Sequence, residues 1–147
     1  ALVAIERVTG QALLRAHPPD VACIGIGCSG HLALNEPGDT DLADRRLVRV
    51  VAVCDASRRQ LEQDPNFRAL GNIPERGITM TVPVILRAEA VLVIAPYALK
   101  AEVVKRVLES PVSAELPATA LKGQPGAQLY LDEDSARSWR AARGLET

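Results

Sequence analysis

The side chains best suited to chemistry lie in one short stretch, "GIGCSGHLALNEPG", which covers residues 25–38. This stretch contains a hydroxyl, an imidazole and a carboxylate, on Ser29, His31 and Glu36. The spacing of His31 and Glu36 is wrong for one helical face, where residues three or four apart meet. A short helical turn ending at Pro37 would still fold Glu36 back towards the imidazole. A carboxylate there fixes the tautomer of a histidine and raises its basicity, so the pair is a candidate proton shuttle. The alternative is a loop histidine beside a solvated glutamate.

The glycines of the stretch allow a second interpretation. Gly25, Gly27 and Gly30 match the G-x-G-x-x-G pattern of dinucleotide-binding loops. Such a loop needs a long helix directly after its third glycine, with the helix N-terminus on the pyrophosphate. Here the chain reaches a Pro-Gly break at residues 37–38, too soon for that helix. We therefore expect no nucleotide cofactor.

The serine and the cysteines of the stretch offer two further alternatives. Ser29 or Cys28, activated by His31, has the chemistry of a nucleophile, but the surrounding residues do not form the G-x-S-x-G elbow. Cys28, His31 and Cys54 have the chemistry of zinc ligands, but the Cys-x-x-Cys spacing of common zinc sites is absent. We favour neither and expect no metal.

The composition predicts a single α/β domain. The chain has 147 residues, of which 48% are hydrophobic and only 3% aromatic, so the core is aliphatic, as in a parallel sheet covered by helices. A net charge of -1 gives no basic footprint for nucleic acid. No apolar run is long enough to span a membrane, and the first residues do not resemble a signal peptide. Three cysteines, an odd number, predict reduced thiols and a cytoplasmic protein.

The hydrophobic pattern alternates between strands and helices along most of the chain. Such alternation predicts parallel strands joined by crossover helices, with ligands bound at the carboxyl ends of the strands. We expect helices over residues 3–17, 56–63, 98–110 and 134–143, strands over 21–26, 47–53, 77–82, 89–95 and 127–133, a short helix beginning near Pro83, and irregular structure over 64–74.

Lys100 is a candidate anion-binding residue on physical grounds. It lies at the start of the helix that follows the strand "EAVLVIA". A cation there faces the positive end of the helix dipole, which is unfavourable by about 0.3–1 kcal/mol. A bound anion reverses that sign, because the ammonium and the backbone N–H groups then act together. A solvated surface lysine is the alternative.

The stretch "GIGCSGHLALNEPG" resembles the signature of the glucosamine-6-phosphate deaminase/isomerase family, in which a strand leads into a glycine-rich turn, then Gly-His, then Asn-Glu-Pro. The segments "LVRVVAVCDASRRQ", "IPERGITMTVPVILRAEAVLVIAP", "KAEVVKRVLESPV", "LPATALKGQP" and "LYLDEDSA" follow in the order of that family. The resemblance covers nearly the whole chain. The sister family of 6-phosphogluconolactonases shares the Gly-His turn but lacks the Asn-Glu-Pro motif.

The resemblance implies the parallel-sheet, three-layer fold of that family and an enzyme that converts glucosamine 6-phosphate and water to fructose 6-phosphate and ammonia. No cofactor is implied, because the carbonyl of the substrate is itself the electron sink. His31 would carry a proton to and from the ring oxygen, and Glu36 would orient and charge-stabilise it. The implied catalytic residues are Ser29, His31 and Glu36, and the implied substrate-binding residues are Gly27, Gly30, Asn35, Arg59 and Lys100.

Three departures from the family pattern qualify this expectation. Ser29 stands where most deaminases have an aspartate, so the electrostatic support of His31 is weaker. Tyr97 stands where the family has a glycine, and a side chain there hinders close approach of the backbone to a phosphate. The resemblance also implies an N-terminal half with a phosphate loop and the carboxylate that moves a proton between carbons, and we expect neither within residues 1–147.

We therefore expect residues 1–147 to be a single partial domain, the C-terminal part of such an enzyme or a degenerate member. A partial fold leaves sheet surface uncovered, so a homo-oligomer or association with an N-terminal half is expected. The substrate is a small sugar phosphate, with no nucleic acid or membrane partner. A 6-phosphogluconolactonase, another sugar-phosphate isomerase, and a non-catalytic sugar-phosphate-binding module remain as alternatives.

Overall fold

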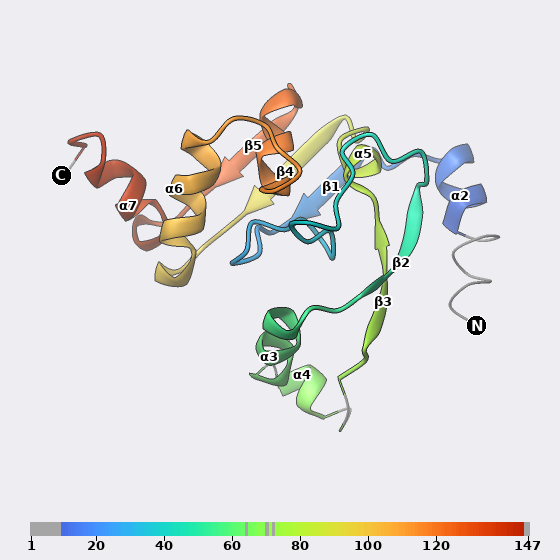
Figure 1. Cartoon of the computed structure of the whole chain (residues 1–147). Coiled ribbons are helices and arrows are strands. Elements are labelled where there is room, and N and C mark those ends of the chain that lie inside the picture. Colours follow the sequence, from blue (N-terminus) through green and yellow to red (C-terminus); the bar gives the residue numbers. More distant parts are fainter. Residues whose placement is uncertain (1–9, 64, 70, 72, 146–147) are drawn as a thin grey trace.

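The strands form two separate sheets (Figure 1). The computed structural model describes residues 10–63, 65–69, 71 and 73–145. A parallel three-stranded sheet has the order β1-β4-β5, and an antiparallel two-stranded ribbon pairs β2 with β3. The strands are β1 Val21–Ile24, β2 Val48–Ala52, β3 Arg76–Met80, β4 Ala90–Ile94 and β5 Ala127–Tyr130.

The helices are mostly short, and all but the first and the last lie between strands in the chain. They are α2 Gln11–Ala16, α3 Asp55–Gln63, α4 Pro65–Arg68, α5 Val82–Ile85, α6 Ala101–Glu109 and α7 Glu133–Ala141, with 3₁₀ helices η2 Ala98–Lys100 and η3 Pro117–Gly123. The β2–β3 ribbon extends away from the parallel sheet, and α3 and α4 lie at its far end (Figure 1). The ribbon thereby places α3 beside the loop that follows β1, where Ser57 of α3 contacts Glu36 of the loop.

One face of the parallel sheet is buried under α6. Val91 and Val93 alternate onto this face and are 0% and 1% exposed. Val104 and Val107 of α6 pack into the same core, as the helical spacing of apolar residues predicts. Full burial of such side chains contributes about 1.5–3 kcal/mol each, which fixes the carboxyl end of the sheet as a rigid support.

The opposite face of the parallel sheet is exposed and apolar among the described residues. Val21, Ile94 and Tyr130, one from each strand, are 54%, 52% and 50% exposed. Parallel strands are normally buried on both faces. The expectation of uncovered sheet surface is therefore met by this face. Within the part of the chain that the structure describes, no helix is long and apolar enough to cross a membrane.

The antiparallel ribbon corrects one sequence prediction. We expected residues 47–53 and 77–82 to join a parallel sheet, but β2 and β3 pair only with each other. The hydrophobic period of a strand is the same in both arrangements, so the pattern does not identify its partner. Residues 65–68, expected to be irregular, form α4. Of the first predicted helix, residues 11–16 are helical and the part before residue 10 lies outside the described residues.

Candidate functional site

The loop after β1 is shaped around the imidazole of His31. The backbone N–H of Gly27 donates to the carbonyl of His31 over 3.0 Å. The backbone N–H of Gly30 donates to the carbonyl of Gly27 over 2.8 Å, which closes the turn. A Cβ on Gly27 would collide with the imidazole ring. Gly30 has a φ of 92°, a region that favours glycine, and a Cβ there would meet Leu116. The two glycines therefore seat His31 at the carboxyl end of the parallel sheet.

Glu36 lies against His31, as the candidate pair requires. Its Oε1 is 2.8 Å from Nδ1 of His31, and the two side chains are 13% and 17% exposed. The connection between them is a tight turn closed by a bridge between Leu32 and Asn35, in which Ala33 has a φ of 52°. The contact predicted from the sequence is present, but the expected helical turn is wrong. The left-handed residue reverses the chain more sharply than a helix can.

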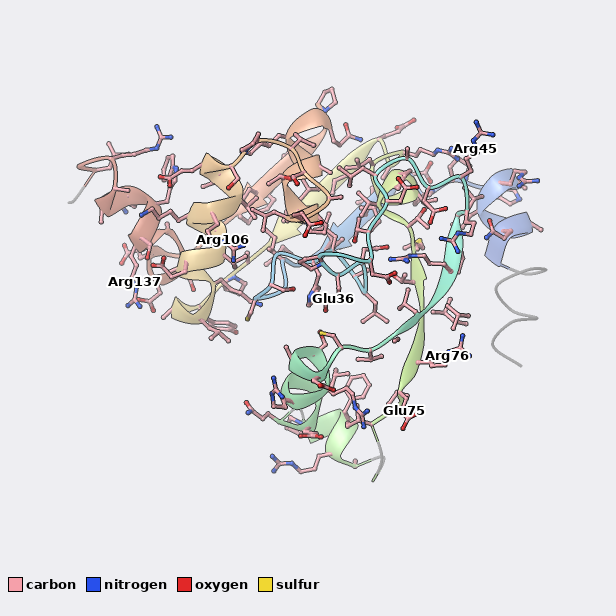
Figure 2. All side chains as sticks on the ribbon, viewed as in Figure 1. Glu36, Arg45, Glu75, Arg76, Arg106 and Arg137 are labelled. Atoms are coloured by element: carbon pink, nitrogen blue, oxygen red, sulfur yellow. The ribbon has the colours of Figure 1, made fainter. Side chains whose placement is uncertain are left out.

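The carboxylate of Glu36 accepts hydrogen bonds from three further side chains. The hydroxyl of Ser29 donates to Oε2 over 2.7 Å, and the hydroxyl of Ser57 donates to Oε1 over 2.7 Å. The thiol of Cys54 donates to Oε1 over 3.2 Å. Figure 2 labels Glu36 in the space between the loops after β1 and the start of α3. Glu36 therefore joins the two parts of the site.

These contacts set the ionisation of Glu36. Partial burial alone raises the pKa of this carboxyl, but the hydrogen bonds from Ser29 and Ser57, the charge of His31 and the bond from Cys54 outweigh it. The pKa of Glu36 is therefore lowered below its usual value. Glu36 is a carboxylate at neutral pH.

The ionised carboxylate determines how His31 holds its proton. Nδ1 of His31 lies 2.8 Å from Glu36 Oε1 and 2.9 Å from the hydroxyl of Ser29. Because the carboxylate only accepts, Nδ1 carries the hydrogen. Nε2 is then the nitrogen without a hydrogen, which is free to accept a proton.

Asn35 supports the loop from beneath. Its side chain is 1% exposed, and its amide donates to the carbonyls of Leu32 and Met80 over 2.8 Å each. Its Oδ1 accepts from Arg49 over 3.4 Å, and Arg49 also pairs with Asp39 over 3.1 Å. We predicted a substrate-binding role for Asn35. The structure does not test that role, but it shows that the buried amide ties the loop to β3 through its hydrogen bonds.

An open pocket of about 290 Å³ adjoins His31. Ser29, His31 and Arg59 line this pocket, so three of the predicted site residues share it. The other lining residues are Cys28, Ala56, Ser57, Gln63 and Leu99. The pocket is near the lower end of the volumes typical of small-molecule sites. It is formed where α3, the loop after β1 and η2 meet.

Lys100 lies beside the pocket rather than in its lining. It is the residue at which η2 gives way to α6, and its Nζ is 3.5 Å from the thiol of Cys28. Cys28 lines the pocket, so the ammonium of Lys100 lies one side chain away from it. Arg59 and Lys100 thus bring positive charge to the pocket from α3 and from the start of α6.

Tyr97 lies in a backbone conformation that disfavours its side chain. It has a φ of 78° and a ψ of 148°, and its ring is 71% exposed. Its N–H donates over 2.8 Å to Asp132, the N-cap of α7. That hydrogen bond is the first cause of the lowered pKa of Asp132, followed by the bonds from Ser135. The family resemblance places a glycine at this position, and the positive φ of Tyr97 is a conformation that glycine adopts readily.

Two residues of the site were missed in the sequence. Ser57 is not among the predicted site residues, and Cys54 is named there only as an alternative zinc ligand and as a reduced thiol. The available signal was positional, because Cys54 and Ser57 lie at the start of a predicted helix, directly after a strand. Among the described residues, no group of three or more His, Cys, Asp and Glu side chains is arranged to hold a metal ion.

Comparison with known proteins identifies relatives of this chain. Residues 3–130 match the family described as "Glucosamine-6-phosphate isomerases/6-phosphogluconolactonase". A glucosamine-6-phosphate deaminase of Exiguobacterium sibiricum is 33% identical over 126 residues, which are 86% of this chain and 48% of that protein. A glucosamine-6-phosphate deaminase of Lysinibacillus sphaericus is 34% identical over 127 residues, 86% of this chain and 55% of that protein. The chain thus spans about half the length of these curated relatives.

Solved structures agree with these relatives. A monomeric glucosamine-6-phosphate deaminase superimposes with a TM-score of 0.81 at 28% identity, over 94% of this chain and 55% of that one. A 6-phosphogluconolactonase from Trypanosoma brucei superimposes with a TM-score of 0.67 at 22% identity, over 92% of this chain and 52% of that one, a likeness of fold alone. With the family match over residues 3–130, the chain belongs to the glucosamine-6-phosphate isomerase/6-phosphogluconolactonase family.

Proposed function

We propose that the protein is an amino-sugar-phosphate deaminase/isomerase that converts glucosamine 6-phosphate and water to fructose 6-phosphate and ammonia. The observation that carries the proposal is the 2.8 Å contact of His31 with an ionised Glu36 at the edge of a pocket. Two relatives that are 33% and 34% identical to this chain are glucosamine-6-phosphate deaminases, which supports this reaction. The Asn-Glu-Pro motif, which the family resemblance assigns to the deaminases and not to the lactonases, also supports this reaction.

His31 is the proton carrier of ring opening in this proposal. Nε2 takes a proton from the anomeric hydroxyl and returns one to the ring oxygen as the C1–O5 bond breaks, so no net proton is consumed. Glu36 stabilises the imidazolium formed in between, and Ser29 holds the outer oxygen of Glu36. Because the hydroxyl of Ser29 carries no charge, Glu36 supplies the negative charge that contacts His31.

Arg59 and Lys100 are the proposed phosphate ligands. Arg59 lines the pocket from α3, and Lys100 stands at the N-terminal end of α6. A phosphate between them would receive charge-assisted hydrogen bonds and the positive end of a nine-residue helix. Gly27 and Gly30 contribute by keeping the loop beside the pocket free of side chains.

The later proton transfer, from C2 to C1, needs a base of its own. None of the described residues that line the pocket is an aspartate or glutamate. Glu36 is occupied by His31 and by three other donors. We therefore propose that residues 1–147 are a partial domain, and that this base comes from a part equivalent to the half of the relatives that the chain does not match.

The same missing part is the proposed cover of the exposed sheet face. Val21, Ile94 and Tyr130 give that face the apolar character of an interior surface. The family relatives have about as many residues again as the chain matches, which is enough for a covering layer. A homo-oligomer formed through this face is the competing outcome when the chain is studied alone.

We further propose that the protein works in the cytoplasm. Cys23, Cys28 and Cys54 are all free thiols. Unpaired and partly exposed thiols persist in a reducing compartment, whereas secreted proteins tend to pair theirs.

The test has two arms. Calorimetry should detect binding of glucosamine 6-phosphate to the 147-residue chain. Replacement of Arg59 by Gln should weaken that binding about tenfold or more, because a charged hydrogen bond is lost. The complete protein should release ammonia and fructose 6-phosphate, with a His31→Ala variant as background. Release of acid from a sugar lactone would instead favour the lactonase, and binding without turnover would favour a non-catalytic module.

A further inference from the structure

We propose that the first turn of α3 is a positioning device for Glu36, and that Ser57 is its main positioning residue. The inference deepens the proposed function, on which it rests for its catalytic meaning. Ser57 and Cys54 come from the segment between the two strands of the antiparallel ribbon, whereas Glu36 comes from the loop after β1. The device therefore joins two separate parts of the fold at one carboxylate.

The geometry at Oε1 of Glu36 carries the inference. This oxygen is 2.8 Å from His31 Nδ1 and 2.7 Å from Ser57 Oγ. The hydroxyl of Ser57 therefore binds the same carboxylate oxygen as the imidazole, and this second hydrogen bond fixes the orientation of the Glu36 carboxylate. Ser57 is 9% exposed, so only a small part of it faces the pocket that it lines. Ser29 holds the other oxygen, Oε2.

The helix itself contributes to the same carboxylate. The carbonyl of Cys54 accepts the hydrogen bond of Arg58 N over 2.9 Å, which makes Cys54 the N-cap of α3. Its sulfur accepts from the backbone N–H of Ser57 over 3.4 Å, while its thiol hydrogen is directed at Glu36. Glu36 therefore faces the positive end of a nine-residue helix, where a negative charge is stabilised.

The neutral Ser29 gives this arrangement its importance. An aspartate at that position would add a second negative charge beside His31, whereas a hydroxyl adds none. Glu36 must then remain ionised and correctly oriented for His31 to be supported. The titratable groups that contact Glu36 are His31, from its own loop, and Cys54, from the start of α3. Of the donors to Glu36 from α3, Ser57 is the stronger, because a thiol is a weak donor.

The test is an NMR titration of the 147-residue chain, with ¹³C labels on the glutamate carboxyls and on the histidine rings. The hydrogen bond from Ser57 lowers the pKa of Glu36, so Ser57→Ala should move the Glu36 titration to higher pH. Ser57→Thr keeps the hydroxyl and should restore the wild-type titration. Ser138→Ala is the matched control, because the Ser138 hydroxyl donates over 2.6 Å to the exposed carboxylate of Glu102 and not to Glu36.

The outcomes separate this inference from the proposed function. A Glu36 titration unchanged in a folded Ser57→Ala variant would overturn the positioning role, whatever the protein catalyses. If that variant does not fold, Ser57→Cys substitutes a weaker donor and should give a smaller shift in the same direction; no shift would again overturn it. In the complete protein, Ser57→Ala should lower kcat/KM about ten- to a hundredfold and move its acidic limb to higher pH. A shifted Glu36 titration without a fall in kcat/KM would support the positioning of Glu36 by Ser57 but would show that this positioning does not contribute to catalysis.

Discussion

The imidazole of His31 lies directly against the Cα of Gly27, with no room for a methyl group between them. Gly27→Ala should therefore displace the ring from Glu36 and destabilise the fold by about 1–3 kcal/mol, the usual cost of overpacking. Urea unfolding measures the stability, and the histidine ring signals report the contact. Gly123→Ala is the control, because a Cβ there meets nothing within 4 Å and the backbone is not strained. If the two substitutions changed the stability and the histidine ring signals equally, Gly27 would not be needed to make room for the imidazole of His31.

Asn35 holds the reactive loop onto β3, so its removal should cost stability before it costs binding. Asn35→Ala removes the two hydrogen bonds that the buried amide donates to the carbonyls of Leu32 and Met80. We expect a loss of about 1–3 kcal/mol, measured by urea unfolding. The control is Gln128→Ala, in which the lost amide is exposed and accepts from Tyr130. A folded Asn35→Ala variant with full stability and no ligand binding would show that Asn35 contacts the ligand after all.

Tyr97 occupies a turn in which a glycine is more stable. Its positive φ costs about 1–3 kcal/mol, whereas a glycine loses about 0.5–1 kcal/mol through the greater freedom of the unfolded chain. The ring is 71% exposed, so little packing is lost. Tyr97→Gly should therefore raise the melting temperature. Ala98→Gly, at the next position and without positive φ, should lower it. A lower melting temperature for Tyr97→Gly would mean that the tyrosine ring contributes packing that outweighs the strain.

The exposed face of the parallel sheet should cause the isolated chain to self-associate. Val21, Ile94 and Tyr130 lie on that face with about half of their surface exposed. Sedimentation at high micromolar concentration should give species larger than the monomer, and Ile94→Lys should reduce them, because a charge on this face opposes burial. The control is Leu99→Lys, at an exposed position outside the sheet. A clean monomer for the wild-type chain would mean that this face is stable in water.

The sequence was sufficient for the elements whose pattern is local. The alternation of Val91 and Val93 with more exposed residues, and the helical spacing of Val104 and Val107, identified β4 and α6. The pairing of β2 with β3 could not be found in the same way, because periodicity shows which face of a strand is buried but not which strand lies beside it.

The candidate site was predictable only in part, for the same physical reason. The proximity of His31 and Glu36 follows from one short segment. Ser57 reaches Glu36 from a helix that the antiparallel ribbon brings across, and no local spacing predicts that approach. Asn35 was identified from its motif, but its burial depends on Arg49 and β3, which are distant in the sequence.

The pairing of His31 with Glu36 is the central claim, and Glu36→Gln tests it most directly. The substitution keeps the shape of the side chain but removes the charge that favours the imidazolium. In the complete protein, kcat for ammonia release should fall about 10²–10⁴-fold, the usual contribution of a general acid–base group, with substrate binding nearly unchanged. The acidic limb of the rate–pH profile, which follows the ionisation of Glu36, should disappear, because glutamine has no carboxyl to ionise.

The matched control is Glu102→Gln, which neutralises an exposed carboxylate of α6. We predict that this variant keeps the wild-type rate and pH profile. The measurement that decides is therefore the pH dependence of kcat for wild type, Glu36→Gln and Glu102→Gln side by side. A large loss of rate together with loss of the acidic limb, for Glu36→Gln alone, is the predicted result. Full activity and an unchanged pH profile for Glu36→Gln would show that Glu36 is only a loop carboxylate, and would contradict the proton shuttle.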